Sequence, residues 1–501
     1  MTDGEQARPG VTLGSVARAT GGKLTGDERA LVRDVTHDSR QAGEGWLFVA
    51  VRGATADANS YVAQVIEQGA VGVISERACP KNFRGAWIEV GDARRALAAA
   101  AAEVHGHPSR ELRLVGVTGT NGKTTIAYLV RALMEAANEK VAMTSTVEYR
   151  IGDEARKAER TTPEASDMQR FLRRAVEAGC RTAVMECSSH AIDLHRCDAL
   201  QLAAAAFTNL TRDHLDYHVT MEAYFAAKRR LFDGSLGERP RASVINIDDA
   251  HGEELARDLL KAKSNVVRYS LKGEAEVTAC DVKLSLEGTR FRLRTPAGER
   301  ELLSPLVGRP HVYNILAAVG CGLALGYDLD VIARAVGACA GAPGRFERVA
   351  HDGDFTVVVD YAHTDDALIN VLRTARSVAP QGRVITVFGC GGDRDRSKRA
   401  PMGEAAASLS DIVILTSDNP RTEDPEQILA DVETGLRASG KPYQKIADRR
   451  QAIHEAIAEA AEKDLVLIAG KGHEDYQLIG REVLHFDDRE VAREALAARK
   501  K

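Results

Sequence analysis

The sequence lacks the features that mark membrane-spanning and secreted proteins. No uninterrupted apolar run reaches the roughly 18 residues that a membrane-spanning helix needs. The first ten residues, MTDGEQARPG, are polar and lack the apolar core of a signal peptide. The eight cysteines are scattered and include no C-x-x-C pair. We therefore expect free thiols, a cytoplasmic location and no membrane span.

The sequence also lacks an excess of basic residues. Its formal net charge is −5 and its isoelectric point is near 6.3. This balance argues against broad electrostatic binding to nucleic acid or to an anionic membrane. No internal repeat is visible, and 44% hydrophobic with 28% charged residues is typical of a globular chain. We therefore expect small molecules, and not nucleic acid or a membrane, as partners.

The order of apolar runs and breaks predicts three α/β domains. Strand-like runs at 46–51 and 70–75 flank a helical run at 60–69, and HGHPSREL at 105–112 is typical of a linker. Strands and helices then alternate from 113 to 187, which indicates a parallel sheet with crossover helices. Further on, the pattern predicts a β-hairpin over 281–303 around EGT, then helical runs from 312 to 339, before a break at AGAPGRF.

We therefore expect a smaller N-terminal α/β domain at 1–110 and a central domain with a parallel sheet at 111–343. Within the central domain, the stretch GVTGTNGKTT at 116–125 is typical of a P-loop ATPase. A Rossmann-like α/β domain is expected at 344–501.

The stretch GVTGTNGKTT at 116–125 is typical of a phosphate-binding loop. Backbone N–H groups of a glycine-rich turn, together with the N-terminal end of the next helix, bind phosphate oxygens. Lys123 is placed to reach the outer phosphates, and Thr124 to put a hydroxyl on Mg²⁺. Apolar residues at 126, 129, 130, 133 and 137 share one face of the predicted helix. An ordinary strand-turn-helix is the alternative, and the five residues between Gly116 and Gly122 exceed the usual four.

Side chains that suit Mg²⁺ follow at two places. Glu186 ends the strand-like run TAVME, from which a carboxylate can reach a metal at Thr124. The segment FTNLTRDHLDYH adds Asp213, His214, Asp216 and His218. Two such histidines are more often surface or core residues than ligands. Lys228, within EAYFAAKRRLF, is by itself typical of a solvated helix face.

Three buried-type strands near the C-terminus each end in a polar loop. RVITVFG leads into CGGDRDRSK, DIVILT into SDNPRTED, and DLVLIAG into KGHEDYQ. Ligands of open α/β sheets bind at the carboxyl ends of strands, so these loops are expected to converge on one small polar molecule. The alternative is that they are polar only because α/β loops generally are.

Taken together, several motifs that occur in one order resemble the Mur ligase family of peptidoglycan synthesis. They are GTNGKTT, MECSSHA, NLTRDHLDYH, AYFAAKRRLF, HVYNILAA, PGRFERV, DYAHT and GCGGDRDRSKR. The resemblance covers essentially the whole chain, and the five-residue loop spacing is the form that this family uses. THDSR at 36–40 and DNPR at 418–421 resemble the members that add the third residue of the stem peptide.

The resemblance implies an ATP-dependent amide ligase of cytoplasmic cell-wall precursor synthesis. Its expected reaction adds meso-2,6-diaminopimelate to UDP-N-acetylmuramoyl-L-alanyl-D-glutamate through an acyl phosphate. The expected cofactors are ATP, two Mg²⁺ and CO₂, the last as a carbamate on Lys228, whose oxygen could bind the second metal. Lys123 and the metals are expected to neutralise the charge between two anionic reactants.

The resemblance also implies roles for individual residues. ATP is expected at Gly119, Thr120, Asn121, Gly122, Lys123, Thr124, Thr125, Asn314, Arg345 and Asp360. The UDP-sugar peptide is expected at His37, Ser39, Thr161, Thr162, Ser188 and Arg196. The expected metal ligands are Thr124, Glu186, His214 and the carbamate of Lys228, and the expected catalytic residues are Lys123, Lys228, Glu186 and His214.

The amino acid to be added is expected at the C-terminal loops. Its expected contacts are Arg394, Asp418, Asn419, Pro420, Arg421, Gly470 and Glu474. A planar guanidinium at Arg421 suits the distal carboxylate of diaminopimelate, which L-lysine lacks. Glu474 and the Gly470 carbonyl are expected to receive the distal ammonium. DNPR could instead be a simple turn, because Asp424-Pro425 resembles a helix start.

Rival interpretations are an L-lysine-adding ligase of the same family, a folylpolyglutamate-type ligase and a nucleotide-switched binding protein or nucleic-acid motor. HDSR and DNPR disfavour the folate enzyme, and the acidic balance disfavours the motor. Three places depart from the family pattern, namely Leu194, Asp365 and the loop after Gly53.

Overall fold

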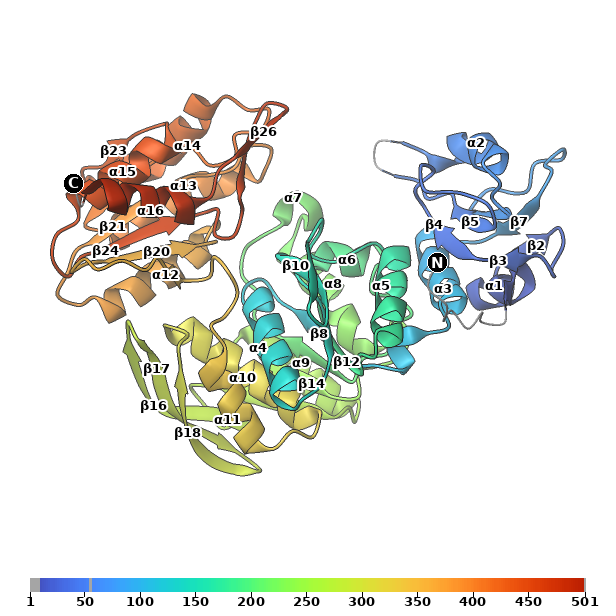
Figure 1. Ribbon diagram of the computed structural model, residues 1–501, viewed down its shortest axis with the longest axis horizontal. Coiled ribbons are helices and arrows are strands. Elements are labelled where there is room, and N and C mark those ends of the chain that lie inside the picture. The colour runs from blue at the N-terminus through green and yellow to red at the C-terminus, as the bar shows by residue number, and fades with distance from the viewer. Residues whose placement is uncertain (1–9, 54–55, 500–501) are drawn as a thin grey trace.

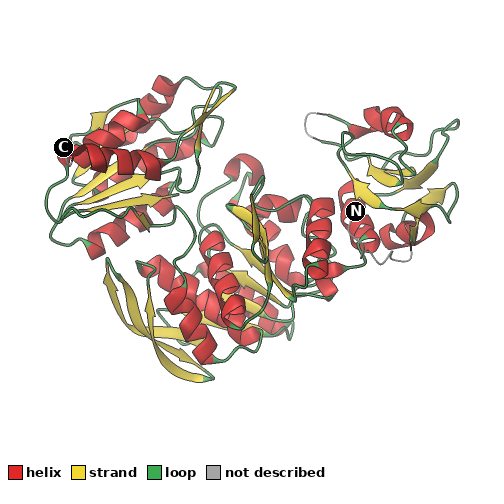
Figure 2. Ribbon diagram, in the orientation of Figure 1, coloured by secondary structure: helices red, strands yellow, loops and turns green. Residues whose placement is uncertain are grey.

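Three α/β units follow one another along the long axis of the molecule (Figures 1 and 2). The computed structural model describes residues 10–53 and 56–499. Residues 1–9, on which the expectation of no signal peptide rests, and residues 54–55 of the loop after Gly53 lie outside these ranges. Within them no helix is both long and apolar enough to cross a membrane. The expected α/β class with a parallel central sheet is confirmed.

The N-terminal unit, at the blue end of Figure 1, is built on a five-stranded sheet. Its order is β2 (Lys23–Thr25), β7 (Ala86–Glu89), β6 (Gly72–Ser75), β5 (Trp46–Val49), β4 (Asp34–Thr36), and only β2 is antiparallel. A small pair, β1 (Val11–Thr12) and β3 (Leu31–Val32), lies beside it. The helices are α1 (Leu13–Thr20), α2 (Val62–Glu67) and α3 (Ala93–Val104). The expected strands at 46–51 and 70–75 and the helix at 60–69 are thus confirmed, with slightly shorter bounds.

A partly buried ion pair joins this unit to the next. Arg170, on α5 (Ala165–Glu177), donates from Nε to Asp34 Oδ2 at 2.8 Å and stacks on the Trp46 ring at 5.2 Å. His105 Nε2 lies 3.1 Å from Asp34 Oδ1. Burial by itself would raise the pKa of Asp34, but the hydrogen bonds from His105 and Arg170 outweigh it and lower the pKa to about 2.

This ion pair predicts an acid-sensitive junction. Because the pKa of Asp34 is lower in the folded state, ionised Asp34 stabilises the folded state above about pH 4. This stabilisation is lost as the pH falls toward 2. We expect the free energy of unfolding to fall by about 2 kcal/mol over this range. Urea unfolding at pH values between 5 and 2, monitored by Trp46 fluorescence, measures this change. Asp34→Asn should remove this acid dependence. Glu301→Gln, in the exposed pair with Arg290, is the matched control and should leave it intact. Equal acid dependence in wild type and Asp34→Asn would contradict the assignment.

The central unit contains one eleven-stranded mixed sheet. Its parallel part has the order β9 (Val141–Thr144), β12 (Thr182–Glu186), β8 (Arg113–Thr118), β13 (Ala204–Phe207), β14 (Ser243–Asn246), β15 (Val266–Ser270), β16 (Val277–Ser285). Antiparallel strands extend both edges: β10 (Glu148–Ile151) and β11 (Glu154–Lys157) on one, β17 (Gly288–Thr295) and β18 (Gly298–Ser304) on the other. The expected hairpin over 281–303 is therefore confirmed and continues into a third strand.

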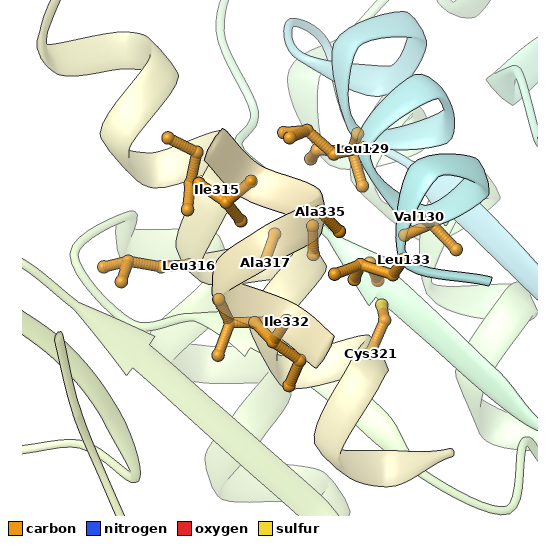
Figure 3. Close-up of a cluster of buried hydrophobic side chains, with 14 of the residues drawn as sticks. Leu129, Val130, Leu133, Ile315, Leu316, Ala317, Cys321, Ile332 and Ala335 are labelled. Carbon is orange, nitrogen blue, oxygen red and sulfur yellow. The ribbon is translucent and has the colours of Figure 1, made fainter. Parts of the chain in front are cut away.

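Helices cover both faces of this sheet. α4 (Lys123–Ala136) packs against α10 (Arg309–Ala324) and α11 (Leu329–Ala338), and Figure 3 shows Leu129, Val130 and Leu133 facing Ala317, Cys321 and Ala335. The predicted apolar face is buried except for Ala137, which lies just beyond the helix end and is partly exposed. The other face carries α5, α6 (Ser189–Asp193), α8 (Met221–Asp233) and α9 (Ala250–Lys261), with the short α7 (Leu215–His218) nearby.

The C-terminal unit is doubly wound. Its sheet order is β19 (Glu347–Arg348), β20 (Thr356–Asp360), β24 (Leu465–Ala469), β21 (Val384–Phe388), β22 (Ile412–Leu415), β23 (Gln444–Lys445), and only β19 is antiparallel. α12 (Asp365–Val378), α13 (Arg399–Leu409) and α14 (Pro425–Ala438) pack on one face, and α15 (Arg449–Glu459) and α16 (Asp488–Arg499) on the other. A separate hairpin joins β25 (Tyr476–Ile479) to β26 (Glu482–His485). The strand order reverses between β21 and β24, where ligand crevices form in such sheets.

Candidate active site

The phosphate loop connects β8 to α4 and depends on two glycines. Gly119 and Gly122 have φ angles of 144° and 94°, which favour glycine. A Cβ at Gly119 would lie 1.8 Å from Thr208 Oγ1, and one at Gly122 would lie 2.4 Å from Asn314 Oδ1. The backbone of the loop thus packs closely against Thr208, directly after β13, on one side and against Asn314 of α10 on the other. This contact explains why Asn314 belongs to the loop's surroundings although it is remote in sequence.

Two lysines converge on one carbonyl of the loop. Lys123 Nζ donates to the carbonyl oxygens of Gly119 and Thr120 at 2.9 and 2.8 Å, and Lys228 Nζ donates to that of Gly119 at 2.8 Å. Lys228 is only 1% exposed, so it is not a residue of a solvated helix face. Burial lowers the pKa of Lys123, and burial together with the nearby Lys123 lowers the pKa of Lys228 well below its ordinary value.

Three other side chains expected to hold metal are Thr124 on the loop, Glu186 and His214. Arg345 Nη2 donates to Thr124 Oγ1 at 3.3 Å, and the fully buried Glu186 accepts from the backbone N–H of Thr146 at 2.7 Å. Glu186 ends β12, which pairs with β8 at Val117. His214 has a left-handed backbone with φ of 55°, and its Nε2 lies 3.4 Å from Asp213 Oδ2. Over the described residues, no three or more His, Cys, Asp or Glu side chains gather closely enough to hold a metal by themselves.

The residues expected at the UDP-sugar peptide fall into two groups. Thr162 Oγ1 donates to the Glu186 carbonyl at 2.8 Å and accepts from the backbone N–H of Ser188 at 3.1 Å, and Arg196 Nη1 donates to the Thr162 carbonyl at 3.4 Å. Thr161 belongs to the same network through Thr146 Oγ1, at 3.2 Å. His37 and Ser39 follow β4 in the N-terminal unit, and neither lines the cavity described below. The structure thus joins four of these six residues.

Arg345 and Asp360 connect the C-terminal unit to the loop. The Arg345 guanidinium lies 4.5 Å from the centroid of the Tyr361 ring while it contacts Thr124. Asp360, at the end of β20, accepts from the backbone N–H groups of Phe346 and Ala362 at 2.7 and 2.8 Å. Burial raises the pKa of this carboxyl group despite the nearby Arg345. Asp360 therefore holds the residue after Arg345 and the residue after Tyr361, whose ring Arg345 contacts.

A cavity of about 610 Å³ lies between the central and C-terminal units. Its central-unit wall includes Thr146, Thr161, His190, Asp213 and His214. Its other wall includes the loops after β21, β22 and β24, which do converge. Of the residues expected to bind the added amino acid, Arg394, Asp418, Asn419, Arg421, Gly470 and Glu474 line it. Pro420 is not among the lining residues and is buried behind them. A Cβ at Gly392 would lie 1.9 Å from the Pro420 carbonyl oxygen.

Arg421 has a constrained position at this cavity. Its φ is 53°, its Nη1 donates to the Gly392 carbonyl at 2.8 Å, and its backbone N–H donates to the Leu478 carbonyl at 3.0 Å. The interpretation of DNPR as a simple turn is incomplete. Asp424 does cap α14, accepting from the backbone N–H of Glu426 at 3.0 Å, but Arg421 lies in the cavity wall before that helix begins.

Comparisons with known proteins agree with these observations. Residues 117–322 match the Mur ligase middle domain, and residues 344–472 match the Mur ligase glutamate ligase domain. A protein of Solibacter usitatus named UDP-N-acetylmuramoyl-L-alanyl-D-glutamate–2,6-diaminopimelate ligase is 46% identical over 465 residues, covering 93% of each chain. One of the same name from Geobacter metallireducens is 45% identical over 498 residues, covering 95% of this chain and 97% of its own. The chain belongs to the Mur ligase family.

A solved structure of a Mur ligase with the same name has a TM-score of 0.71 and 34% identity. The match covers 98% of this chain and 100% of that one. Mur ligases are ATP-dependent, which agrees with the phosphate loop, and a solved Mur ligase from Thermotoga maritima has been described in complex with ADP.

Two of the positions expected to depart from the family pattern, Leu194 and Asp365, lie at the ends of helices. Asp365 begins α12, and Arg212 Nη2 donates to its Oδ1 at 3.0 Å across the two units. Beside it, Asp366 Oδ2 accepts from Asn121 Nδ2 of the phosphate loop at 3.1 Å. Leu194 follows the last turn of α6 and is partly buried. An acidic residue at 365 therefore links the C-terminal unit to the central one.

Sequence analysis gave no role to several residues of this Mur ligase site. Lys398, Tyr361, His363 and His473 line the cavity, and Lys471 lies fully buried behind it. Their common signal is position, because each lies within the segment that follows the carboxyl end of β20, β21 or β24. Sequence analysis used that signal for Arg394 and Glu474, but it cannot tell which neighbours turn inward.

Proposed function

We propose that this chain is the ATP-dependent ligase that adds meso-2,6-diaminopimelate to UDP-N-acetylmuramoyl-L-alanyl-D-glutamate. The observation that carries the proposal is the cavity that the phosphate-loop unit and the three C-terminal loops line together. One wall includes Thr146 and Thr161, which belong to the hydrogen-bond network around Glu186. The opposite wall includes Arg421, Asp418 and Glu474. This arrangement suits a reaction that joins an activated carboxyl group on one side to an amino acid on the other.

The first step proceeds at the phosphate loop. The D-glutamyl carboxylate attacks the γ-phosphorus of ATP, which forms an acyl phosphate and releases ADP. Both reactants are anionic, so the barrier falls when cations lie between attacking and leaving oxygens. Lys123 supplies one such cation once its Nζ turns from the Gly119 and Thr120 carbonyls to the phosphates. Arg345, anchored on Tyr361 and Thr124, closes the same site from the C-terminal unit.

The donor set fits Mg²⁺ and a lysine carbamate. Thr124 offers a hydroxyl, Glu186 a buried carboxylate and His214 an imidazole, and Mg²⁺ usually takes one or two protein ligands besides phosphates and water. Lys228 is buried with a strongly lowered pKa, and the neutral amine is the form that reacts with CO₂. We propose that Thr124, Glu186, His214 and carbamylated Lys228 hold two Mg²⁺. When bound, these ions supply positive charge to the transferring phosphoryl group.

The second step is the capture of the acyl phosphate by the amine of diaminopimelate. Arg421 is proposed to bind the distal carboxylate, with Arg394 at a second carboxylate, and Asp418, Asn419, Gly470 and Glu474 to receive the distal ammonium. The amine attacks the activated carbonyl carbon, phosphate leaves, and an amide forms. L-Lysine offers the ammonium but no carboxylate for Arg421, which would leave a partly buried guanidinium unpaired.

Arg421→Ala tests this assignment. We expect kcat/KM for meso-diaminopimelate to fall about 30-fold or more, because truncating one partner of a buried charge pair costs about 2 kcal/mol or more. The KM for ATP should change less than about twofold, since Arg421 does not contact the phosphate loop. ADP release and the mass of the product are measured with UDP-N-acetylmuramoyl-L-alanyl-D-glutamate and either meso-diaminopimelate or L-lysine.

Arg437→Ala is the matched control. Arg437 lies on α14 of the same unit, and its side chain is 69% exposed. It should behave as wild type. Unchanged diaminopimelate kinetics in Arg421→Ala would remove the specificity assignment. Activity of wild type with L-lysine alone, with a folate alone or only with nucleic acid would remove the proposed function.

The three units are proposed as domains at 1–110, 111–343 and 344–501 that bind UDP-sugar, ATP and the incoming amino acid, with His37 and Ser39 at the uridine end. A cytoplasmic, monomeric enzyme is part of the same proposal. The eight cysteines, all within the described ranges and all free, are consistent with a reducing compartment.

A further inference from the structure

Lys471 is a fully buried cation at the wall of the cavity. It directly follows Gly470 at the end of β24, and its side chain has no exposed surface. Its Nζ donates to Asn419 Oδ1 at 3.1 Å and to Glu474 Oε2 at 3.3 Å, and it lies 3.7 Å from Asp418 Oδ1. An ammonium group has three N–H donors, and here they face three side chains from two different loops.

These contacts fix the orientation of Asn419. Its Oδ1 accepts from Lys471 and from the backbone N–H of Leu478 at 3.0 Å, so its Nδ2 must point the other way, where it donates to Glu474 Oε2 at 2.9 Å. Lys471 and Asn419 thus share one oxygen of Glu474. In the described part of the chain no hydrogen bond reaches Oε1 of Glu474, and that side chain lines the cavity.

Lys471 offsets one of the two negative charges around this point. Asp418 and Glu474 bring two carboxylates to a nearly buried place, and Lys471 brings one ammonium group. Buried carboxylates without a counter-charge tend to become protonated, because desolvation disfavours the charged form. With Lys471 present, the group keeps one net negative charge, which matches one ammonium group of a ligand.

We propose that Lys471 is a positioning residue that presents Glu474 Oε1, ionised and correctly turned, to an ammonium group of the incoming amino acid. This inference rests on the proposed function and names a residue that positions the ammonium-binding carboxylate of the same site. Lys471 does not contact the ligand in this assignment; it acts through Glu474 and Asn419.

Other observations agree with this role. The pKa of Glu474 is raised overall, by burial and by the nearby Asp418, and Lys471 and Asn419 act against that rise. Gly470 has a φ of 122°, and a Cβ there would lie 2.8 Å from Asp418 Oδ2, so the chain before Lys471 is held close to the same carboxylate. Gln477 Nε2 donates to the Asp418 carbonyl at 2.8 Å, which ties the β25 hairpin to the loop.

Lys471→Met removes the charge and keeps most of the volume. We expect the KM for meso-diaminopimelate to rise about 10-fold or more, while the KM values for ATP and UDP-N-acetylmuramoyl-L-alanyl-D-glutamate change less than about twofold. Formation of the acyl phosphate, trapped with hydroxylamine without any amino acid, should remain within about threefold of wild type. Lys463→Met, at the other end of β24 and 59% exposed, is the control and should behave as wild type.

A double-mutant cycle separates positioning from general destabilisation. In the Glu474→Gln background, Lys471→Met should raise the KM for diaminopimelate by less than about threefold, because the charge on which it acts is gone. The double variant does not leave both Asp418 and Glu474 without a counter-charge. Glu474→Gln can therefore be compared with the double variant even where Lys471→Met alone does not fold. A 10-fold effect in both backgrounds, or an unchanged KM in folded Lys471→Met, would overturn the inference. Failure of wild type to use meso-diaminopimelate would overturn the proposed function instead.

Discussion

Lys123→Ala is expected to lower kcat by about 1000-fold while the protein stays folded. The expected size follows from the loss of one preorganised cation where charge develops in the transition state. Lys123 begins α4, so its ammonium group also lies at the positive end of a helix of fourteen residues that points at the phosphates. In the structure it has no acidic partner at hydrogen-bond distance among the described residues; its Nζ donates only to the Gly119 and Thr120 carbonyls. It is therefore available to a ligand.

The measurement is single-turnover formation of ADP and of trapped acyl phosphate at saturating ATP. Lys261→Ala, at the exposed end of α9, is the control. A kcat within tenfold of wild type would show that the phosphates are neutralised by other groups. Because Lys123 also lowers the pKa of Lys228, the variant should raise that pKa and reduce the neutral amine fraction at Lys228.

The sequence predicts those strands of this fold that are apolar on both faces of the sheet. β12, β21, β22 and β24 are buried throughout or nearly so, and each coincides with a predicted run. Sequence analysis assigned no strand at β10 and β11. β11 reads EARK and is fully exposed at the sheet edge, so no apolar pattern marks it. An edge strand is held by ladder hydrogen bonds rather than by burial.

The candidate site is predictable where chemistry lies in one short motif. The phosphate loop needs positive φ at Gly119 and Gly122, and the presence of glycine at these positions predicts that conformation. Lys228 and Lys471 differ, because local sequence cannot tell a buried lysine from a solvated one. Lys228 stands in a run with Arg229 and Arg230, and it is buried only because α8 packs beside the loop that carries Gly119. Such burial depends on contacts between residues more than a hundred positions apart.

Asp488→Ala is expected to destabilise the C-terminal unit by about 3–5 kcal/mol, since it leaves a buried arginine without its counter-charge. Arg449 and Asp488 are both fully buried, and Arg449 donates from Nε and Nη2 to the two carboxylate oxygens at 2.8 and 2.7 Å. Glu494→Ala is the matched control. It removes the exposed partner of Arg450, which joins the same two helices, and should cost less than about 1 kcal/mol.

Hydrogen exchange of β24 amides in the full chain measures this effect, and protection should fall about 100-fold or more. Both tryptophans, Trp46 and Trp87, lie in the N-terminal unit, so their fluorescence serves as an internal control that should not change. Arg449 also donates to the Ala469 carbonyl at 3.0 Å and the Ser417 carbonyl at 3.4 Å, immediately before Gly470 and Asp418. The KM for diaminopimelate should therefore rise with the loss of protection. Unaltered protection of β24 would mean that the ion pair contributes nothing to holding the two acceptor loops together.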